Sequence, residues 1–358
     1  MRVQCSDEIL IAEADGAHVG SKERGMTEET RLDGGAAAQR AALPATQELL
    51  TAARAELGRV IAGQNEVIGE VLVAVLSQGH ALLEGVPGIA KTLIVKSVGR
   101  LLGLGFQRVQ GTPDLMPADI LGTTMFRPGA DAFTFHAGPV FTDLLLVDEI
   151  NRMPPRTQAA LLECMEERQV TSDGVRRPLP EWFTVFATEN PIDFEGTYPL
   201  PEAQLDRFLL KIKVAYPSID DERQMLERHQ AIGTANLLEE AKIEPLSPEL
   251  LKTARREIRA IRVEQDLYGY ILDLVRRTRE WPMLALGASP RAAICLLRVA
   301  QALAAFEDRD YVIPDDVKRA VLPALRHRIL LKPEAELEGF DPDRVLNDLI
   351  AAVAVPRG

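Results

Sequence analysis

The chain has few of the residues that link a protein covalently or through a metal ion. Its 358 residues include 3 cysteines and 5 histidines, and Cys5, Cys164 and Cys295 lie far apart in the sequence. Neither residue type has the spacing of a disulfide framework or of a zinc site. We therefore expect no structural metal and a reducing, cytoplasmic environment.

Long apolar runs and an excess of positive charge are missing as well. The longest runs, such as 71–76, fall far short of the ~20 residues of a membrane span, and the N-terminus lacks a secretory pattern. Lys and Arg number 41 against 53 Asp and Glu, a formal net charge of −12. These features predict no membrane span and disfavour constitutive binding to nucleic acid, whose phosphates repel an acidic protein.

The chain does contain enough apolar residues for a large core, since hydrophobic residues make up 46% of it. Its length favours two domains. Residues 1–44 lack a sustained period and predict a flexible leader, residues 45–215 predict an α/β core, and residues 216–358 predict a smaller, all-helical domain. In that last region Ser247-Pro248 and Ser289-Pro290 each offer an N-cap residue followed by a first-turn proline.

Within 45–215, helical and extended patterns alternate. An amphipathic helix is predicted from residue 45 to about 62–63, and three unbroken apolar runs at 81–83, 144–147 and 183–187 are typical of strands buried on both faces. Such strands predict a parallel sheet covered by helices. Turn residues at 128–129 and 173–174, each flanked by short extended runs, predict two β-hairpins inserted into this scaffold.

A loop after the first strand has the pattern of a phosphate-binding loop. Residues 85–92 read Gly-Val-Pro-Gly-Ile-Ala-Lys-Thr, in which Ala90 replaces the usual glycine before the lysine. Its Cβ is acceptable if residue 90 already has helical dihedrals. Backbone N–H groups at the helix start would face an anion, Lys91 would reach the β- and γ-phosphates, and the Thr92 hydroxyl would bind Mg²⁺. The simpler interpretation is a strand-to-helix turn with a surface lysine.

Acidic and amide side chains follow the next two strands. Asp148 and Glu149 come at the carboxyl end of the second run, where open α/β sheets bind ligands. Asp148 is suited to hold Mg²⁺ through water, and Glu149 to deprotonate the attacking water. Asn190 follows the third run, where a neutral amide can bond the water or the γ-phosphate.

Two arginines occupy positions that suit phosphate chemistry. Arg291 lies in the first turn of the helix after Ser289-Pro290, where the helix dipole disfavours a cation unless an anion is near. Arg207 lies where a helical pattern gives way to an apolar run, so it could project beyond its own subunit. The simpler interpretation pairs each arginine with a surface carboxylate.

These stretches together resemble AAA+ ATPases of the MoxR type. The similarity covers residues 83–92, 112–117, 147–152, 196–208 and 286–292, and it runs from about Ile61 to the C-terminus. The resemblance implies an AAA+ P-loop αβα nucleotide-binding domain with a parallel sheet, a helical lid domain, and a hexameric ring with ATP and Mg²⁺ at the subunit interfaces. It also implies that the hairpins at 128–129 and 173–174 are the helix-2 insert and the pre-sensor hairpin, which face the pore.

The same resemblance assigns roles to single residues. By it Asn190 is similar to sensor 1, Arg291 to sensor 2 and Arg207 to an arginine finger supplied to the neighbouring subunit. Glu189 departs from the family, which commonly has glutamine there, and a charge beside sensor 1 would slow hydrolysis unless it points away. Nucleotide contacts are implied for Gln64 beside the adenine and for Gly85, Val86, Pro87, Gly88, Ile89, Ala90, Lys91, Thr92 and Leu93.

The function implied is that of an ATPase which drives chaperone-like remodelling, maturation or metal-cofactor insertion of a partner protein bearing a von Willebrand A domain. Two alternatives stay open. One is an ATP-gated scaffold with little turnover, which Ala90 and Glu189 favour slightly. The other is a DNA-dependent motor of related architecture, which the acidic charge disfavours.

Overall fold

The structure is a computed structural model that describes residues 43–127, 132–190, 196–232 and 237–356. All of these belong to one unit, residues 40–358. Of the leader predicted over 1–44, residues 1–42 lie outside the described residues, and Pro44 already begins helix α1. The flexible leader stays a prediction. So does the domain boundary at 215/216, because the described residues on both sides of it belong to the same unit.

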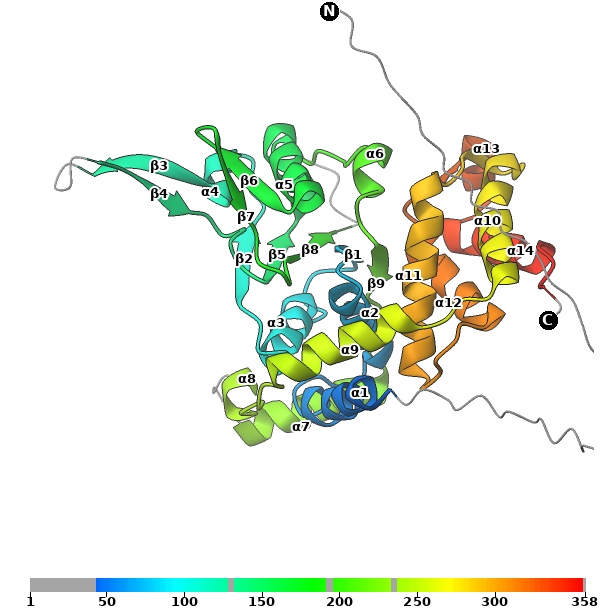
Figure 1. The fold of residues 1–358 in the computed structure, drawn as a ribbon, viewed down its shortest axis with the longest axis horizontal. Helices are drawn as coiled ribbons and strands as arrows, with labels where there is room; N and C mark the ends of the chain where they lie inside the picture. The colour runs from blue at the N-terminus through cyan, green and yellow to red at the C-terminus, as the bar shows by residue number, and fades with distance from the viewer. Residues whose placement is uncertain (1–42, 128–131, 191–195, 233–236, 357–358) are drawn as a thin grey trace, which may run out of the picture. The chain divides into compact units, whose positions relative to one another are not determined.

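A five-stranded parallel sheet in the order β2-β5-β8-β1-β9 forms the centre of the core (Figure 1). The three predicted strands are its middle ones, since an unbroken apolar run fits a strand that is covered on both faces. The edge strands were not predicted, because β2 has one buried residue and β9 alternates leucine and isoleucine with lysine. The bounds are β1 Ala81–Glu84, β2 Phe106–Gln110, β5 Leu144–Asp148, β8 Thr184–Glu189 and β9 Leu210–Lys213.

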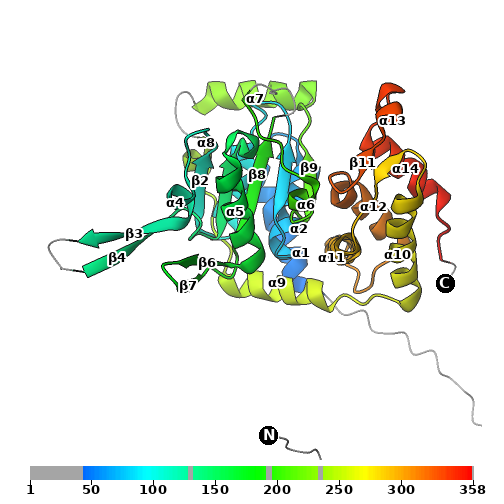
Figure 2. The same cartoon turned by 90° about the horizontal axis from the view of Figure 1, so that it is seen from above.

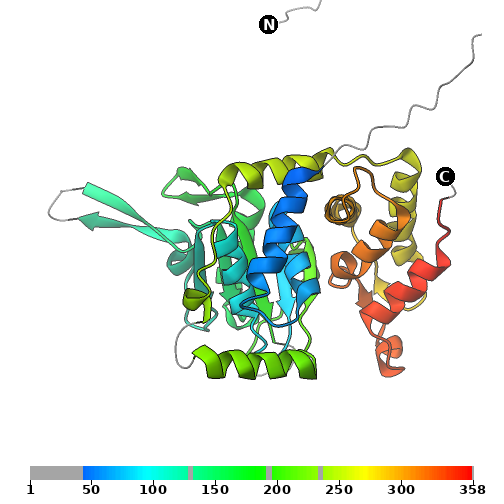
Figure 3. The same cartoon turned by 90° about the horizontal axis from the view of Figure 1, so that it is seen from below.

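Helices cover both faces of this sheet (Figure 2, Figure 3). Alternate strand residues pack against α1, α2 and α3 on one face and against α4 and α5 on the other. The first helix ends at Leu57, earlier than predicted, although Val60 beyond it is buried; the apolar period continued past the helix because the following turn also packs on the core. The bounds are α1 Pro44–Leu57, α2 Asn65–Leu76, α3 Lys91–Leu101, α4 Pro117–Leu121, the 3-10 turn η1 Ile150–Arg152, α5 Pro155–Glu167 and α6 Glu202–Leu205.

Both predicted hairpins are present as antiparallel pairs. The first extends away from the sheet on the side of β2 (Figure 1), and its turn, with the predicted residues 128–129, lies outside the described residues. The second turns at Asp173 and Gly174, whose φ angles of 53° and 73° suit the tight turn that joins two strands directly. The bounds are β3 Gly122–Arg127, β4 Ala132–Ala137, β6 Gln169–Ser172 and β7 Val175–Pro178.

The C-terminal region is helical, with one exception. A short antiparallel pair, β10 Leu284–Leu286 and β11 Leu330–Leu331, corrects the prediction that this region is all-helical; strands this short carry no readable period. Ser247 caps its helix by accepting a bond from the Leu250 N–H, as predicted, whereas the Ser289 hydroxyl bonds Asp206 instead. The helices are α7 Ile219–Ile232, α8 Leu237–Glu240, α9 Pro248–Ala260, α10 Gln265–Glu280, α11 Pro290–Phe306, α12 Pro314–Leu325, α13 Pro333–Leu337 and α14 Pro342–Ala352.

The helical region is joined to the core by buried polar contacts as well as by one shared apolar cluster. Arg328, which is buried, donates through Nε to Asp206 Oδ1 at 2.7 Å and through Nη1 to the Leu209 carbonyl at 3.2 Å. Because these acceptors lie directly before β9, the helical region is fixed to the sheet at its edge strand β9. Across the described ranges, none of the helices is both long and apolar enough to cross a bilayer.

Candidate functional site

The predicted phosphate-binding loop connects β1 to α3. Gly85 is required there, because a Cβ would lie 2.5 Å from the Ile89 Cδ1 atom and 2.7 Å from the Val214 carbonyl oxygen. Ala90 has φ 65° and ψ 19°, a left-handed conformation. Its dihedrals are therefore not those of the right-handed helix, the condition on which its Cβ was expected to fit, and the strain is on the order of 1 kcal/mol.

Lys91 and Thr92 begin α3 directly after this loop. The Lys91 ammonium donates to the carbonyl oxygens of Gly85 and Val86, so it lies folded over the loop. Burial lowers the pKa of Lys91, while the charges of Asp148 and Glu149 act in the opposite direction. The lysine and both predicted acids are thus close enough to interact electrostatically.

Asp148 is the last residue of β5 and Glu149 follows it, so both acids lie at the carboxyl ends of the parallel strands, as the loop after β1 does. Asp148 is buried, and Glu149 has a left-handed backbone with φ 55° and ψ 56°. Thr188 of the adjacent β8 holds both: its hydroxyl accepts from the Glu149 N–H at 2.9 Å and donates to Asp148 Oδ1 at 3.4 Å. The sequence offered no signal for Thr188 beyond its place in a buried strand.

Three further side chains engage these acids, and sequence reasoning missed all three. Arg108 and Gln110 share one face of β2: the Arg108 Nε lies 2.5 Å from Asp148 Oδ2, and the Gln110 amide donates to Glu149 Oε2 at 3.3 Å. Arg152 in η1 lies 2.9 Å from the same Glu149 oxygen. Two of them were missed because the edge strand β2 was not predicted. Their effect is to fix the direction in which both carboxylates point.

Glu189 is the last residue of β8, and Asn190 follows directly after the strand. Successive strand residues point to opposite faces, so Glu189 lies away from the face on which Thr188 contacts the acids. It is paired in register with Glu84, which forms an ion pair with Lys211. Burial raises the pKa of Glu189, and Lys211 moderates the increase. Asn190, the residue directly after β8, is buried.

A cavity of about 260 Å³ adjoins the loop. Its lining is mostly apolar, which suits a planar base, and it includes both Gln64 and residues of the loop; that Gln64 borders an adenine stays a prediction. Gln64 has a left-handed backbone with φ 59°, and its amide donates to the Ala215 carbonyl at 2.8 Å. The lining residues are Val60, Ile61, Ala62, Gln64, Pro87, Gly88, Ile89, Ala90, Leu93, Tyr216, Pro217, Glu222 and Met225.

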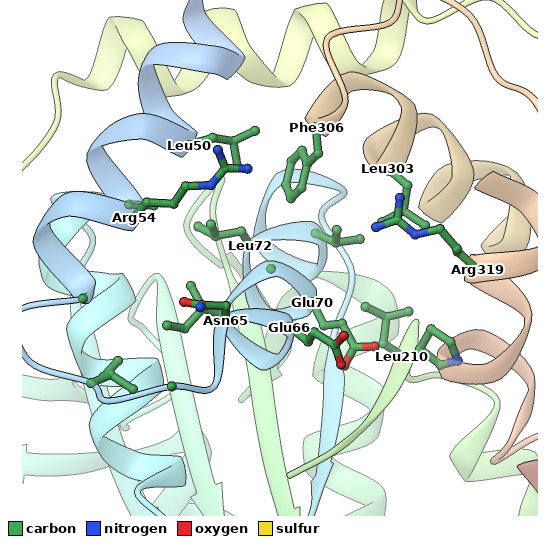
Figure 4. Close-up of a pocket in the computed structure, with 18 of the residues that line it drawn as sticks. Leu50, Arg54, Asn65, Glu66, Glu70, Leu72, Leu210, Leu303, Phe306 and Arg319 are labelled. Carbon is green, nitrogen blue, oxygen red and sulfur yellow. The ribbon is translucent and has the colours of Figure 1, made fainter. Parts of the chain in front are cut away.

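A larger cavity of about 1010 Å³ lies elsewhere, between α1 and α2 on one side and α11 and α12 on the other (Figure 4). None of the predicted site residues lines it. Leu50, Leu72 and Phe306 form its apolar part, while Glu66 and Glu70 lie on one face of α2. Burial raises the pKa of Glu70 to about 7. Cavity size alone would therefore have pointed away from the loop.

The two predicted arginines both form ion pairs with one carboxylate, that of Glu166, which the sequence analysis did not single out. Arg207 Nη2 lies 3.0 Å from Glu166 Oε2, and Arg291 Nη1 lies 3.3 Å from Glu166 Oε1. Within the described ranges, neither arginine makes a hydrogen bond or ion pair with the loop, Asp148 or Glu149. The simpler interpretation, a carboxylate partner for each arginine, is thus what the isolated chain has.

The residues at the loop fit Mg²⁺ bound with a nucleotide. Mg²⁺ usually takes one or two protein oxygens together with water and phosphate oxygens, and the Thr92 hydroxyl and Asp148 are such a pair. Among the described side chains, no group of three or more His, Cys, Asp or Glu is arranged to hold a metal ion without such a ligand. Gly88 adds room, because a Cβ there would meet no atom within 4 Å.

Comparison with known proteins gives concordant matches over most of the chain. Residues 80–210 match the model of the ATPase family associated with various cellular activities (AAA), and residues 276–349 match that of the AAA lid domain. Chaperone MoxR1 of Mycobacterium tuberculosis is 43% identical over 319 residues, 84% of this chain and 81% of its own. YeaC of Bacillus subtilis is 41% identical over 312 residues, which are 86% of this chain and 95% of its own. A crystal structure from Cytophaga hutchinsonii superposes with a TM-score of 0.81 at 38% identity, over 88% of this chain and 97% of its own.

Proposed function

The chain belongs to the MoxR family of AAA+ ATPases, and we propose that it binds ATP with Mg²⁺ and hydrolyses it to ADP and phosphate. The observation that carries this proposal is that Lys91, after the loop that follows β1, and Asp148 and Glu149, at the end of β5, lie at the carboxyl ends of strands of one parallel sheet, with a cavity of about 260 Å³ beside the loop. Backbone strain is also present there, as it is at many functional sites: Gln64, Ala90 and Glu149 are three of the eight described residues that are left-handed without being glycine.

Each residue has a distinct task in this reaction. The loop N–H groups and Lys91 would bind the phosphates, for which Lys91 would leave the carbonyls of Gly85 and Val86. Bound Mg²⁺ supplies charge compensation on the β- and γ-phosphate oxygens. Thr92 and Asp148 would hold it, with Asp148 Oδ1 free enough to accept a water because its bond from Thr188 is long, 3.4 Å.

Glu149 would act as the general base in water attack. Its carboxylate is held from two sides, by Gln110 at 3.3 Å and by Arg152 at 2.9 Å, and its N–H is held by Thr188. Such restraint fixes the base relative to the γ-phosphate. Asn190, directly after β8, would orient the water, while Glu189, which alternates with Thr188 along the strand, would point to the opposite face and would not add the charge that slows hydrolysis.

Assembly into a hexameric ring completes the proposal. Arg207 and Arg291 contact Glu166 and not the loop of their own chain. They would therefore act on the nucleotide of an adjoining subunit, where positive charge stabilises the transition state of phosphoryl transfer. Loss of the γ-phosphate would remove the charge that they grip and loosen the interface.

The proposed use of this cycle is chaperone-like remodelling of a partner protein, either its maturation or the insertion of a metal cofactor. The relative from Mycobacterium tuberculosis is named as a chaperone, and another relative, from Methanocaldococcus jannaschii, as a magnesium-chelatase subunit homolog. We propose a partner with a von Willebrand A domain, by family resemblance. A cytoplasmic location stays a prediction; Cys164 and Cys295 are unpaired and buried, which suits a reducing compartment.

Steady-state phosphate release tests the proposal. Glu149→Gln removes the base but keeps the size of the side chain, so it should retain ATP and lose turnover. The alternative is an ATP-gated scaffold, which the ion pair of Asp148 with Arg108 favours because that pair competes with metal binding. Equal, near-zero rates in both forms, with ATP bound in both, would favour the scaffold and contradict hydrolysis.

A further inference from the structure

We propose that Glu166 is a positioning residue that assembles Arg207 and Arg291 into one phosphate-sensing pair. This inference rests on the proposed ATPase function and deepens it. No sequence motif drew attention to Glu166. The structure singles it out, because it is the only described residue that forms ion pairs with both arginines.

The geometry of this contact assigns one carboxylate oxygen to each guanidinium. Oε2 faces Arg207 Nη2 at 3.0 Å and Oε1 faces Arg291 Nη1 at 3.3 Å. The three residues come from segments far apart in the chain: the end of α5, the turn after α6, and the first turn of α11. A single carboxylate therefore determines how the core arginine and the lid arginine lie relative to each other.

Helix stability does not explain an acid at this position. Glu166 lies in the last turn of α5, where the partial negative charge of the helix end disfavours a carboxylate. The side chain is 42% exposed, so it also contributes little to the core. Its remaining contacts are the ion pairs with the two arginines. Since neither the helix nor the core accounts for a glutamate here, we assign it the role of holding these arginines.

Electrostatics explain why the arginines need such a residue. Two guanidinium groups repel each other, and a carboxylate between them offsets that repulsion while leaving a net positive charge. Both arginines remain partly exposed, at 29% and 44% of their side chains, so they stay accessible to an anion. A triphosphate on an adjoining subunit would meet two preoriented donors of net positive charge.

A second set of contacts holds the backbones but not the guanidinium tips. Asp206, next to Arg207, accepts from the Ser289 hydroxyl at 2.9 Å and from Arg328 Nε at 2.7 Å. The first of these bonds joins the segment before β9 to Ser289 at the start of α11, two residues before Arg291, and the second joins it to the turn after α12. Loss of Glu166 should therefore leave the two segments together and release only the arginine side chains.

The test compares Glu166→Ala with Glu167→Ala in the full-length protein. The control removes the same charge from the same helix end, at an exposed neighbour. We expect Glu166→Ala to lower kcat for ATP about 10-fold, because misplaced transition-state groups cost rate. The KM for ATP, ring assembly and thermal stability should match wild type. A second variant, Glu166→Gln, keeps the side-chain size and should also lower kcat, since its amide offers one acceptor oxygen in place of two.

Coupling to Arg291 separates positioning from a general structural effect. In an Arg291→Ala background, Glu166→Ala should cost less than in wild type, because one of the two groups that it positions is already gone. An undiminished cost would overturn the inference, as would equal rates for Glu166→Ala and Glu167→Ala, or a faster Glu166→Ala. If wild type itself releases no phosphate from ATP, the proposed function fails and this inference with it; if wild type is active, the comparison tests Glu166 alone.

Discussion

Three of the eight described residues that have a left-handed backbone without being glycine lie at the proposed nucleotide site. Gln64, Ala90 and Glu149 have φ angles of 59°, 65° and 55° and belong to three separate segments that meet there. Such a conformation costs an L-residue about 1 kcal/mol. Since nothing in local sequence preference favours it, tertiary contacts must hold it, and those contacts shape the loop and orient Glu149, the proposed general base.

The strain at Ala90 predicts a stabilising substitution. Ala90→Gly should raise the free energy of unfolding by about 0.5–1 kcal/mol, because glycine adopts this conformation without a Cβ clash. Ala55→Gly is the matched control: Ala55 is an exposed residue inside α1, so glycine there should destabilise by a similar amount. Chemical denaturation of both variants measures the two shifts. A destabilised Ala90→Gly would contradict the strain argument.

Glu70 predicts a pH dependence of stability. Burial raises its pKa from 4.5 to about 7, so between these values the folded chain keeps a proton that the unfolded chain has lost. Stability therefore falls as pH rises through this range. Glu70→Gln removes the effect and should be more stable than wild type at pH 8, by on the order of 2 kcal/mol, with little difference below pH 4.5. The control Glu48→Gln changes an exposed residue of α1 and keeps Glu70, so in parallel thermal denaturation its stability should fall with pH as that of wild type does.

At the scale of elements, sequence patterns predicted the strands that are covered on both faces and missed the strands at the edges of the sheet. The middle strands β1, β5 and β8 are apolar throughout because helices cover both faces. The edge strands β2 and β9 are partly exposed, so their polar residues concealed them. Arg108 and Gln110, which engage both acids, were missed for this reason. The loop residues could be predicted because their motif is local, whereas Thr188 and Glu166 depend on contacts across the fold.

One helix start depends on a distant residue in a way that no local pattern indicates. The Glu257 carboxylate on α9 accepts from the N–H groups of Ala45 and Thr46 at 3.1 and 2.8 Å, and from the Thr46 hydroxyl at 2.7 Å. It thereby caps α1, whose own N-cap residue, Leu43, makes no side-chain cap bond. The region assigned to the lid thus also stabilises the core.

Removing this cap should destabilise the whole unit. Glu257→Ala would leave those three donors, two of them on the fully buried Thr46, without their charged acceptor. The expected loss is about 2 kcal/mol in the free energy of unfolding. Glu249→Ala, on an exposed position in the first turn of the same helix, should lose less than about 0.5 kcal/mol. Similar losses for both would contradict the capping role, as would an unchanged α1 start in hydrogen exchange of Glu257→Ala.

At the scale of the whole molecule, the main feature is that the proposed site is divided into two separate parts. The loop, Lys91 and the acids lie at one edge of the sheet, and the arginines lie on Glu166 between core and lid. A single chain therefore presents two incomplete halves. In a ring each half would meet its complement on a neighbour, so activity should depend on assembly and fall with dilution.

Mixing experiments follow from this division. Arg207→Ala should lower ATP hydrolysis by about 10³-fold and leave nucleotide affinity nearly intact, because the contact forms mainly in the transition state. Lys91→Ala should lose nucleotide binding but keep its arginines. When the two inactive variants are mixed, an Arg207→Ala subunit holds ATP while its Lys91→Ala neighbour supplies Arg207, so phosphate release should recover in part.

Recovery should follow co-assembly, measured by size-exclusion chromatography. Mixed rings without recovery would contradict action between subunits, and a large loss of ATP affinity in Arg207→Ala would show that the arginine binds the ground state.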